Sequence, residues 1–223
     1  MPDGPELFPP PLVYAAARFE PGEEARFDGI DLPAEVARAV PKRRLEFLAG
    51  RHCAAVALRR LQPGLGEGAI GIGGDRAPLW PEGIVGSITH TRGFAAAVVA
   101  RAVDAGGVGL DTEHLVSGSA RQAVEERVTT PEETGRLASA GLSEAALLTL
   151  VFSAKESLFK CLFPKVGRYF GFDAASIVEV STDRRTFCAE LCVALGRFAA
   201  GTRFAGRYTL ESDLVHTGVI LPP

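Results

Sequence analysis

The sequence has little of what marks secreted, membrane-spanning or nucleic-acid-binding proteins. It holds four cysteines in 223 residues, and its formal net charge is only −3. No Cys-x-x-Cys pair and no zinc-spaced pair of histidines is present, so we expect buried, reduced thiols. The longest apolar run, 94–100, is far shorter than the roughly 20 residues that span a bilayer.

The same lack of bulk charge and of leader-like segments limits the partners and the compartment. A weak net charge provides no strong field for nucleic acid, so any polyanion site must be local. No N-terminal segment combines basic residues with an apolar run, so no signal peptide is expected. We therefore predict a cytoplasmic protein without a membrane span and without a nucleic-acid partner.

The chain does have the composition of an ordinary folded protein, at 47% hydrophobic and 23% charged residues. Pro41 suits the first position of a helix, and apolar residues then recur at spacings of three and four up to Val56. This predicts an amphipathic helix that ends before Gln62. A second long helix is expected over 147–163, closed by Pro164.

Alternating or continuous apolar runs bounded by turn residues predict the strands. The expected strands are 86–89, 93–100, 108–112, 187–193, 204–211 and 214–221. Helix-then-strands therefore occurs in each half, which favours an α+β fold (α/β-type) of two similar lobes, 1–108 and 109–223. Each lobe is expected to pack a small, mainly antiparallel sheet on a long helix, and residues 1–11 are expected to form an irregular arm.

Asp111 and Glu113 are the first candidates for chemistry. On a strand, residues two apart project from one face, roughly 7 Å from each other. Both carboxylates could reach one magnesium ion, which prefers a few carboxylates together with phosphate oxygens and water. The alternative is a solvated strand end.

Lys155, Glu156 and Lys160 lie on the second predicted helix, where Glu156 and Lys160 share a face. They could hold a phosphate beside a metal, or they could form an ordinary surface salt bridge. Arg44 and Arg51, seven apart on the first helix, could grip a phosphate or lie on a solvated basic face.

His90 follows a predicted strand that carries Ser87 and Thr89, and Arg76 precedes it in a loop. These groups could donate hydrogen bonds to phosphate oxygens, although a lone histidine is more often structural. The order of the groups along the chain is what matters. An Arg-bearing helix comes first, then Gly-Ser-x-Thr-His, Gly-x-Asp-x-Glu and Lys-Glu-x-x-x-Lys.

With these four motifs the chain resembles a 4′-phosphopantetheinyl transferase of the Sfp type, in the branch of enterobactin synthase component D. The motifs are RRLEFLAGR (43–51), WPEGIVGSITH (80–90), GLDTE (109–113) and FSAKESLFK (152–160). The resemblance implies two lobes in a pseudo-two-fold arrangement, with the active site between them. It implies transfer of the phosphopantetheine arm of coenzyme A to a serine of an apo acyl or peptidyl carrier protein, with release of adenosine 3′,5′-bisphosphate.

The resemblance also implies the role of each candidate residue. Asp111, Glu113 and Glu156 would be ligands of Mg²⁺, with Mn²⁺ as the alternative ion, and Glu156 would accept the serine proton. Lys155 joins these acids in the catalytic set. The groups implied to hold coenzyme A are Arg44, Arg51, Arg76, Ser87, Thr89, His90, Asp111, Lys155 and Lys160. Which cation meets the 3′-phosphate and which the pyrophosphate stays open.

Two other functions are compatible with the same residues. One is a different magnesium-dependent enzyme acting on phosphoesters or nucleotides, and the other is a non-catalytic binder of coenzyme A or of carrier proteins. The carrier itself is open among siderophore, polyketide, non-ribosomal peptide and fatty-acid synthesis. Because each lobe would find its partner within the chain, we expect a monomer.

Overall fold

The structure is a computed structural model that describes residues 7–66, 70–74, 77–118 and 120–223. The chain divides into two compact units, one made of residues 1–106 with 222–223 and the other of residues 107–221. Both combine helices with antiparallel sheets, so the predicted α+β class with two sheet-containing lobes is confirmed. The predicted boundary between 108 and 109 lies inside the first strand of the second unit.

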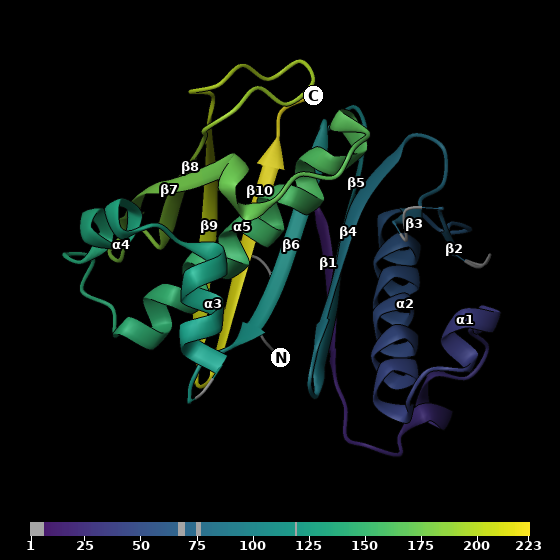
Figure 1. Ribbon diagram of the computed structural model, residues 1–223. Coiled ribbons are helices and arrows are strands. Elements are labelled where there is room, and N and C mark those ends of the chain that lie inside the picture. The colour runs from purple at the N-terminus through teal and green to yellow at the C-terminus, as the bar shows by residue number, and fades with distance from the viewer. Residues whose placement is uncertain (1–6, 67–69, 75–76, 119) are drawn as a thin grey trace. The chain divides into compact units, whose positions relative to one another are not determined.

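The first unit is built on a three-stranded antiparallel sheet of order β1-β5-β4 (Figure 1). Its strands are β1 (Val13–Arg18), β4 (Ile84–Thr91) and β5 (Phe94–Arg101). The central strand β5 is buried from Phe94 to Ala100, and four of these seven residues are alanines, which let a helix pack closely. The sequence predicted the strands of the β4–β5 hairpin but missed β1, because only Val13 and Tyr14 of its six residues favour a strand and three alanines follow them.

Helix α2 (Pro41–Leu61) packs against this sheet, with Leu45, Leu48 and Cys53 in the shared core. The predicted start and end of the helix are confirmed, since Pro41 occupies its first turn and Gln62 is extended. Two short helical segments precede it, η2 (Glu24–Phe27) and α1 (Ala34–Ala37). A small ribbon of β2 (Gly71–Ile72) and β3 (Pro78–Leu79) follows it.

The second unit is built on a five-stranded antiparallel sheet of order β6-β10-β9-β8-β7. The strands are β6 (Gly107–His114), β7 (Ala175–Ser181), β8 (Thr186–Leu191), β9 (Arg203–Glu211) and β10 (Leu214–Leu221). Strand β6 pairs with β10, which comes more than a hundred residues later, so Asp111 lies opposite Thr217. The long helix α5 covers one face of this sheet (Figure 1).

Helix α5 runs from Glu144 to Val166, longer at both ends than the predicted 147–163. Ser143 caps its start by accepting a hydrogen bond from the Ala146 amide. Pro164, predicted to close the helix, lies inside its last turn, where it removes one backbone donor only two residues before the end. The helix ends at Gly167, whose positive φ of 70° suits a glycine cap.

Two shorter helices and a 3-10 turn complete the second unit. These are α3 (Ala120–Val128), α4 (Pro131–Leu137) and η3 (Phe172–Ala174). Thr130 caps α4, and its side chain accepts a hydrogen bond from the Glu133 amide. Among the described residues, no helix is long and apolar enough to cross a membrane.

The expectation of buried thiols is only half right. All four cysteines are free, but only Cys53 and Cys161 are buried, and burial raises the pKa of each thiol to about 12. Cys192 is exposed because β8 ends at Leu191 and not at the predicted residue 193. Cys188 is half-buried on the same strand.

Gly109 allows α5 to lie directly on β6. A Cβ at this position would collide with the carbonyl oxygen of Ser157, and a Cβ at Gly107 would meet the carbonyl oxygen of Cys161 at 2.9 Å. Since side chains alternate along a strand, Asp111 projects from the same face as these two glycines. The glycines therefore bring the helix backbone close, and Asp111 meets the helix one step further along the strand.

We expect Gly109→Ala to destabilise the protein by about 3 kcal/mol, at the upper end of over-packing costs, because the opposing atom belongs to a helix backbone. Urea unfolding followed by circular dichroism measures this change. The matched control is Gly135→Ala in α4, where no atom lies within 4 Å of the added Cβ. This control should gain about 0.5–1 kcal/mol from helix propensity, and equal effects of the two substitutions would contradict the close-approach argument.

Candidate active site

The second unit places acids and a lysine on the facing sides of β6 and α5. Asp111 on β6 is buried, and its Oδ1 accepts a hydrogen bond of 2.7 Å from Lys160 Nζ on α5. The same ammonium also donates to the carbonyl oxygen of Leu110 at 3.1 Å. Lys160 is therefore hydrogen-bonded to strand β6. These bonds take the place of the surface salt bridge with Glu156, which the four-residue spacing on the helix would have allowed.

Glu156 lies on α5 one turn before Lys160 and is half-buried. Burial raises the pKa of the Glu156 carboxyl, the charge of Asp111 raises it further, and the charge of Lys160 lowers it. Asp111 and Glu156 are therefore close enough to repel each other when both are ionised. A carboxylate whose pKa is raised in this way accepts a proton more readily than an exposed one.

The predicted three-carboxylate metal site stays a prediction. In the described ranges, no three His, Cys, Asp or Glu side chains form a group that could hold a metal ion. Glu113 follows Asp111 by two residues on β6 and is half-buried there, so by alternation it projects from the same face. Oxygen donors of this kind suit magnesium, and a divalent cation would relieve the repulsion between Asp111 and Glu156.

The sequence analysis suggested that Lys155 could hold a phosphate, but in the structure its side chain is not free to move over one. Its side chain is 5% exposed, and its Nζ donates to the carbonyl oxygen of Val128 at 2.6 Å and to Glu133 Oε2 at 2.8 Å. Glu133 is a functional candidate that the sequence analysis did not select. The available signal was the Thr130-x-x-Glu133 spacing, which is typical of a capping box and points to a helix start, not to a lysine.

Lys155 and Glu156 also line a small pocket of about 70 Å³ beside α5. Its other walls are mostly apolar and aromatic, formed by Leu158, Phe159, Tyr169, Phe170, Gly171, Phe172 and Ala175. The Phe159 ring packs at a tilt against two others in this wall, with its centroid 5.4 Å from that of Tyr169 and 4.9 Å from that of Phe170. The pocket therefore offers an apolar surface with two ionisable groups at its edge.

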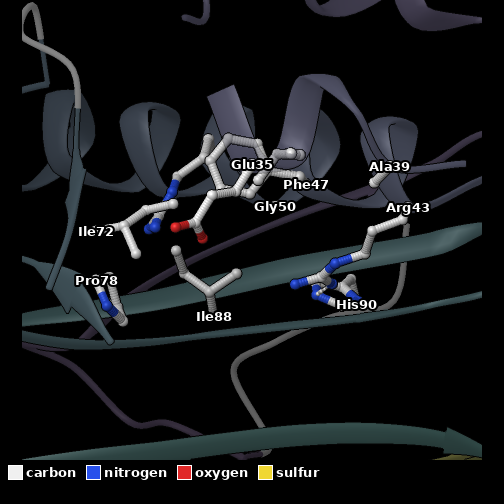
Figure 2. Close-up of a pocket in the computed structure, with 11 residues that line it drawn as sticks. Glu35, Ala39, Arg43, Phe47, Gly50, Ile72, Pro78, Ile88 and His90 are labelled. Atoms are coloured by element: carbon white, nitrogen blue, oxygen red, sulfur yellow. Dashed lines mark hydrogen bonds between the residues drawn. The ribbon is translucent and has the colours of Figure 1, made fainter. Parts of the chain in front are cut away.

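The first unit contains a larger pocket, of about 280 Å³, with cationic side chains in its wall. Its lining comes from α1, α2, β2, β3 and β4 (Figure 2). Arg43 Nη1 lies 2.6 Å from His90 Nε2, and since a guanidinium can only donate, the histidine accepts there. Its other ring nitrogen faces Glu46 Oε2 at 3.7 Å, and Figure 2 shows the Glu35 carboxylate directed into the pocket.

Arg51 is the most unusual group of this pocket. Its residue is 7% exposed, its Nη2 donates to the carbonyl oxygen of Gly71 at 3.3 Å, and its guanidinium stacks on the Phe47 ring at 5.0 Å. Within the described part of the chain, its Nε and Nη1 have no hydrogen-bond partner. Burial and the charge of Arg43 lower the pKa of Arg51 to about 10. Buried donors of this kind are costly unless an anion meets them.

The structure brings Arg43, and not the predicted Arg44, into this pocket. Arg43, Phe47 and Arg51 recur every four residues and so share one face of α2, whereas Arg44 is turned about 100° away. Arg44 donates instead to the carbonyl oxygen of Ala39 at 2.9 Å.

The other predicted nucleotide ligands are not all in the pocket wall. His90 lines the pocket, together with Ile88 on the same face of β4. Ser87 and Thr89 are buried and by alternation belong to the opposite face of that strand. Arg76 lies outside the described residues.

Two family models match the chain, one in each unit. Residues 32–100 match the 4′-phosphopantetheinyl transferase N-terminal domain, and residues 107–208 match the 4′-phosphopantetheinyl transferase superfamily. These ranges contain all four motifs.

Several characterised relatives are similar over most of their length. 4′-Phosphopantetheinyl transferase Svp of Streptomyces mobaraensis is 43% identical over 83% of this chain and 75% of its own. 4′-Phosphopantetheinyl transferase PptT of Mycobacterium tuberculosis is 34% identical over 85% and 86%. Enterobactin synthase component D of Escherichia coli strain K12 is 38% identical over 64% and 66%.

The raised pKa of Glu156 predicts a pH-dependent effect of Glu156→Gln. The pKa of the Glu156 carboxyl is higher in the folded protein than its usual value of 4.5. The carboxyl therefore does not destabilise the protein below pH 4.5, and it lowers the free energy of unfolding as the pH rises through the folded pKa. With a chelator present, we therefore expect the variant and the wild type to be similar near about pH 4, and the variant to be the more stable near about pH 8. Urea midpoints at the two pH values measure the difference.

Glu132→Gln provides a control of opposite sign. The pKa of Glu132 is lowered by hydrogen bonds from its own backbone amide and from Thr130. That variant should be the less stable at high pH, with the difference shrinking as the pH falls. A constant gap between wild type and Glu156→Gln across the range would contradict the assignment.

Proposed function

The chain belongs to the 4′-phosphopantetheinyl transferases, and from this membership we propose its reaction. The protein transfers the 4′-phosphopantetheine arm of coenzyme A to a serine of an apo acyl or peptidyl carrier protein, and adenosine 3′,5′-bisphosphate leaves. The observation that carries the proposal is the cluster of Asp111, Glu156 and Lys160 between β6 and α5.

In this reaction Glu156 accepts the serine proton. The serine oxygen forms a bond to the phosphorus that bears pantetheine, and the bond from that phosphorus to the bisphosphate breaks. The raised pKa of Glu156 supports this role, since a base works best with a pKa near the working pH. Lys160, held by Asp111 and the Leu110 carbonyl, stabilises negative charge on the pyrophosphate oxygens.

Magnesium fits the donor set of Asp111, Glu113 and Glu156, which supplies only carboxylate oxygens. When bound, it would neutralise charge on the phosphoanhydride and so ease attack by an anionic nucleophile. Burial and, after it, the charge of Asp111 raise the pKa of Glu156, and the nearness of these two acids supports such a site.

Each pocket, taken by itself, suits one chemical part of coenzyme A. Arg51 presents buried guanidinium donors, with Arg43 and His90 in the same wall, which suits a phosphate of the nucleotide end. The aromatic pocket beside Glu156 suits the largely apolar arm next to the reacting phosphorus. Positioning the reacting groups in this way supplies much of the rate in phosphoryl transfer.

The direct test is to incubate the protein with coenzyme A, magnesium and several apo carrier proteins, and to measure carrier mass. A gain of one phosphopantetheine supports the proposal. Hydrolysis of coenzyme A or a nucleotide without carrier labelling would favour a different phosphoester enzyme. Tight binding without turnover would favour a non-catalytic binder.

We expect Asp111→Asn to lower carrier labelling by at least about 100-fold, since it removes a charge that Lys160 and the proposed metal both need. The side chain keeps its shape, so the fold should persist by circular dichroism. Asp183→Asn, in the exposed turn after β7, is the matched control and should label at the wild-type rate. Near-normal labelling by a folded Asp111→Asn protein would remove Asp111 from the site.

Arg51→Met should raise KM for coenzyme A by about 10- to 100-fold, as expected for loss of a charged hydrogen bond, with a much smaller change in kcat. Arg59→Met, at an exposed position of the same helix, is the control. Steady-state kinetics and calorimetric titration with adenosine 3′,5′-bisphosphate measure the two effects. A fall in kcat with KM unchanged would instead place Arg51 at the reaction centre.

A further inference from the structure

We propose that Glu133 is a positioning residue for the transfer reaction, which fixes the Lys155 ammonium in the wall of the aromatic pocket beside Glu156. This inference rests on the proposed function. It gives a role to a buried acid that lies outside the four motifs and that does not line the pocket of Arg51.

The Lys155 ammonium is held by two acceptors from different elements. The carbonyl oxygen of Val128, at the last residue of α3, accepts at 2.6 Å, and Glu133 Oε2 on α4 accepts at 2.8 Å. A carbonyl at a helix C-terminus has no partner in its own helix and carries part of the negative end of the helix dipole. Both acceptors are therefore suited to bind a positive charge.

Glu133 is itself fixed at both oxygens. Its Oε1 accepts from the backbone amide of Ile177 on β7, and the side chain is 1% exposed. In a capping box the acid at this position turns back to the amide of the capping residue. Here Thr130 still accepts from the Glu133 amide at 3.2 Å, but the Glu133 carboxylate is directed to Lys155 and Ile177.

Stability alone does not explain why this pair is charged. The side chains of Lys155 and Glu133 are 5% and 1% exposed, and removing a buried pair from water costs about as much as its attraction returns. Apolar side chains of similar volume often give equal stability at such positions. The pair therefore points to a function that needs a charge at this place.

An ammonium carries three N–H donors. Among the described residues, Val128 and Glu133 take two of them, and Lys155 also lines the aromatic pocket next to Glu156. In the proposal, the third donor meets a substrate oxygen in that pocket. Since the first two bonds fix the nitrogen, the donor keeps its position through the reaction, which is how a preorganised group stabilises developing charge.

The test is a double-mutant cycle on kcat for carrier labelling, with Glu133→Gln, Lys155→Gln and the double variant. Glutamine can accept from only one of the two donors that meet Glu133, so it releases either Lys155 or Ile177. We expect Glu133→Gln to lower kcat by about tenfold or more with KM for coenzyme A nearly unchanged. In the Lys155→Gln background the same change should cost less than about twofold.

Two further variants complete the design. Glu133→Asp keeps the charge and should restore part of the lost kcat. Glu132→Gln, at the exposed neighbouring position in α4, should match the wild type. Thermal unfolding of every variant confirms that the compared proteins are folded, and if Glu133→Gln does not fold, the cycle is run with Glu133→Asp in both backgrounds.

The inference is overturned if a folded Glu133 variant keeps wild-type kcat, or if its cost is the same with and without Lys155, since a purely structural acid would act equally in both backgrounds. Failure of the proposed function gives a different result, because the wild type itself would then leave every apo carrier unlabelled. In that case, residual binding of adenosine 3′,5′-bisphosphate would still report on the nucleotide pocket separately.

Discussion

The contact of the α5 backbone with Gly109 on β6 is the constraint on which the rest of the second unit depends. Without side chains at Gly107 and Gly109, the helix lies on the strand, and Asp111 meets Lys160 and Glu156 one step further on. The acids come from segments about forty-five residues apart, so their meeting is set by this packing and not by local sequence. The Gly-x-Asp pattern thus combines a packing requirement with a chemical one.

Much of the fold could be predicted from periodicity and turn residues. The α2 boundaries and most strands follow from local signals, which is why the sequence analysis predicted them. Strand β1 was missed because its strand signal is limited to Val13 and Tyr14, and because its pairing with β5 joins residues some eighty positions apart. The pseudo-two-fold relation between the lobes, and a site between them, stay predictions.

The site shows the same division between local and distant information. Spacing selected Asp111, Glu156 and Lys160, which the structure brings together. It could not show that Arg43 lines the pocket and Arg44 does not, because this depends on which face of α2 meets β4. The family resemblance implied a phosphate for Lys155, and nothing in the sequence near Lys155 indicates its buried partner on another helix. Glu133 was not selected, since its sequence context indicates only the start of a helix.

Arg51 has a consequence for the protein in the cell. Its unmet buried donors make the ligand-free first unit less stable than its packing alone would allow. Any anion that satisfies them binds the native state and not the unfolded chain, so it shifts the unfolding equilibrium by mass action. The lifetime of the protein against proteolysis should then follow the abundance of its nucleotide substrate, which would couple enzyme turnover to metabolic supply.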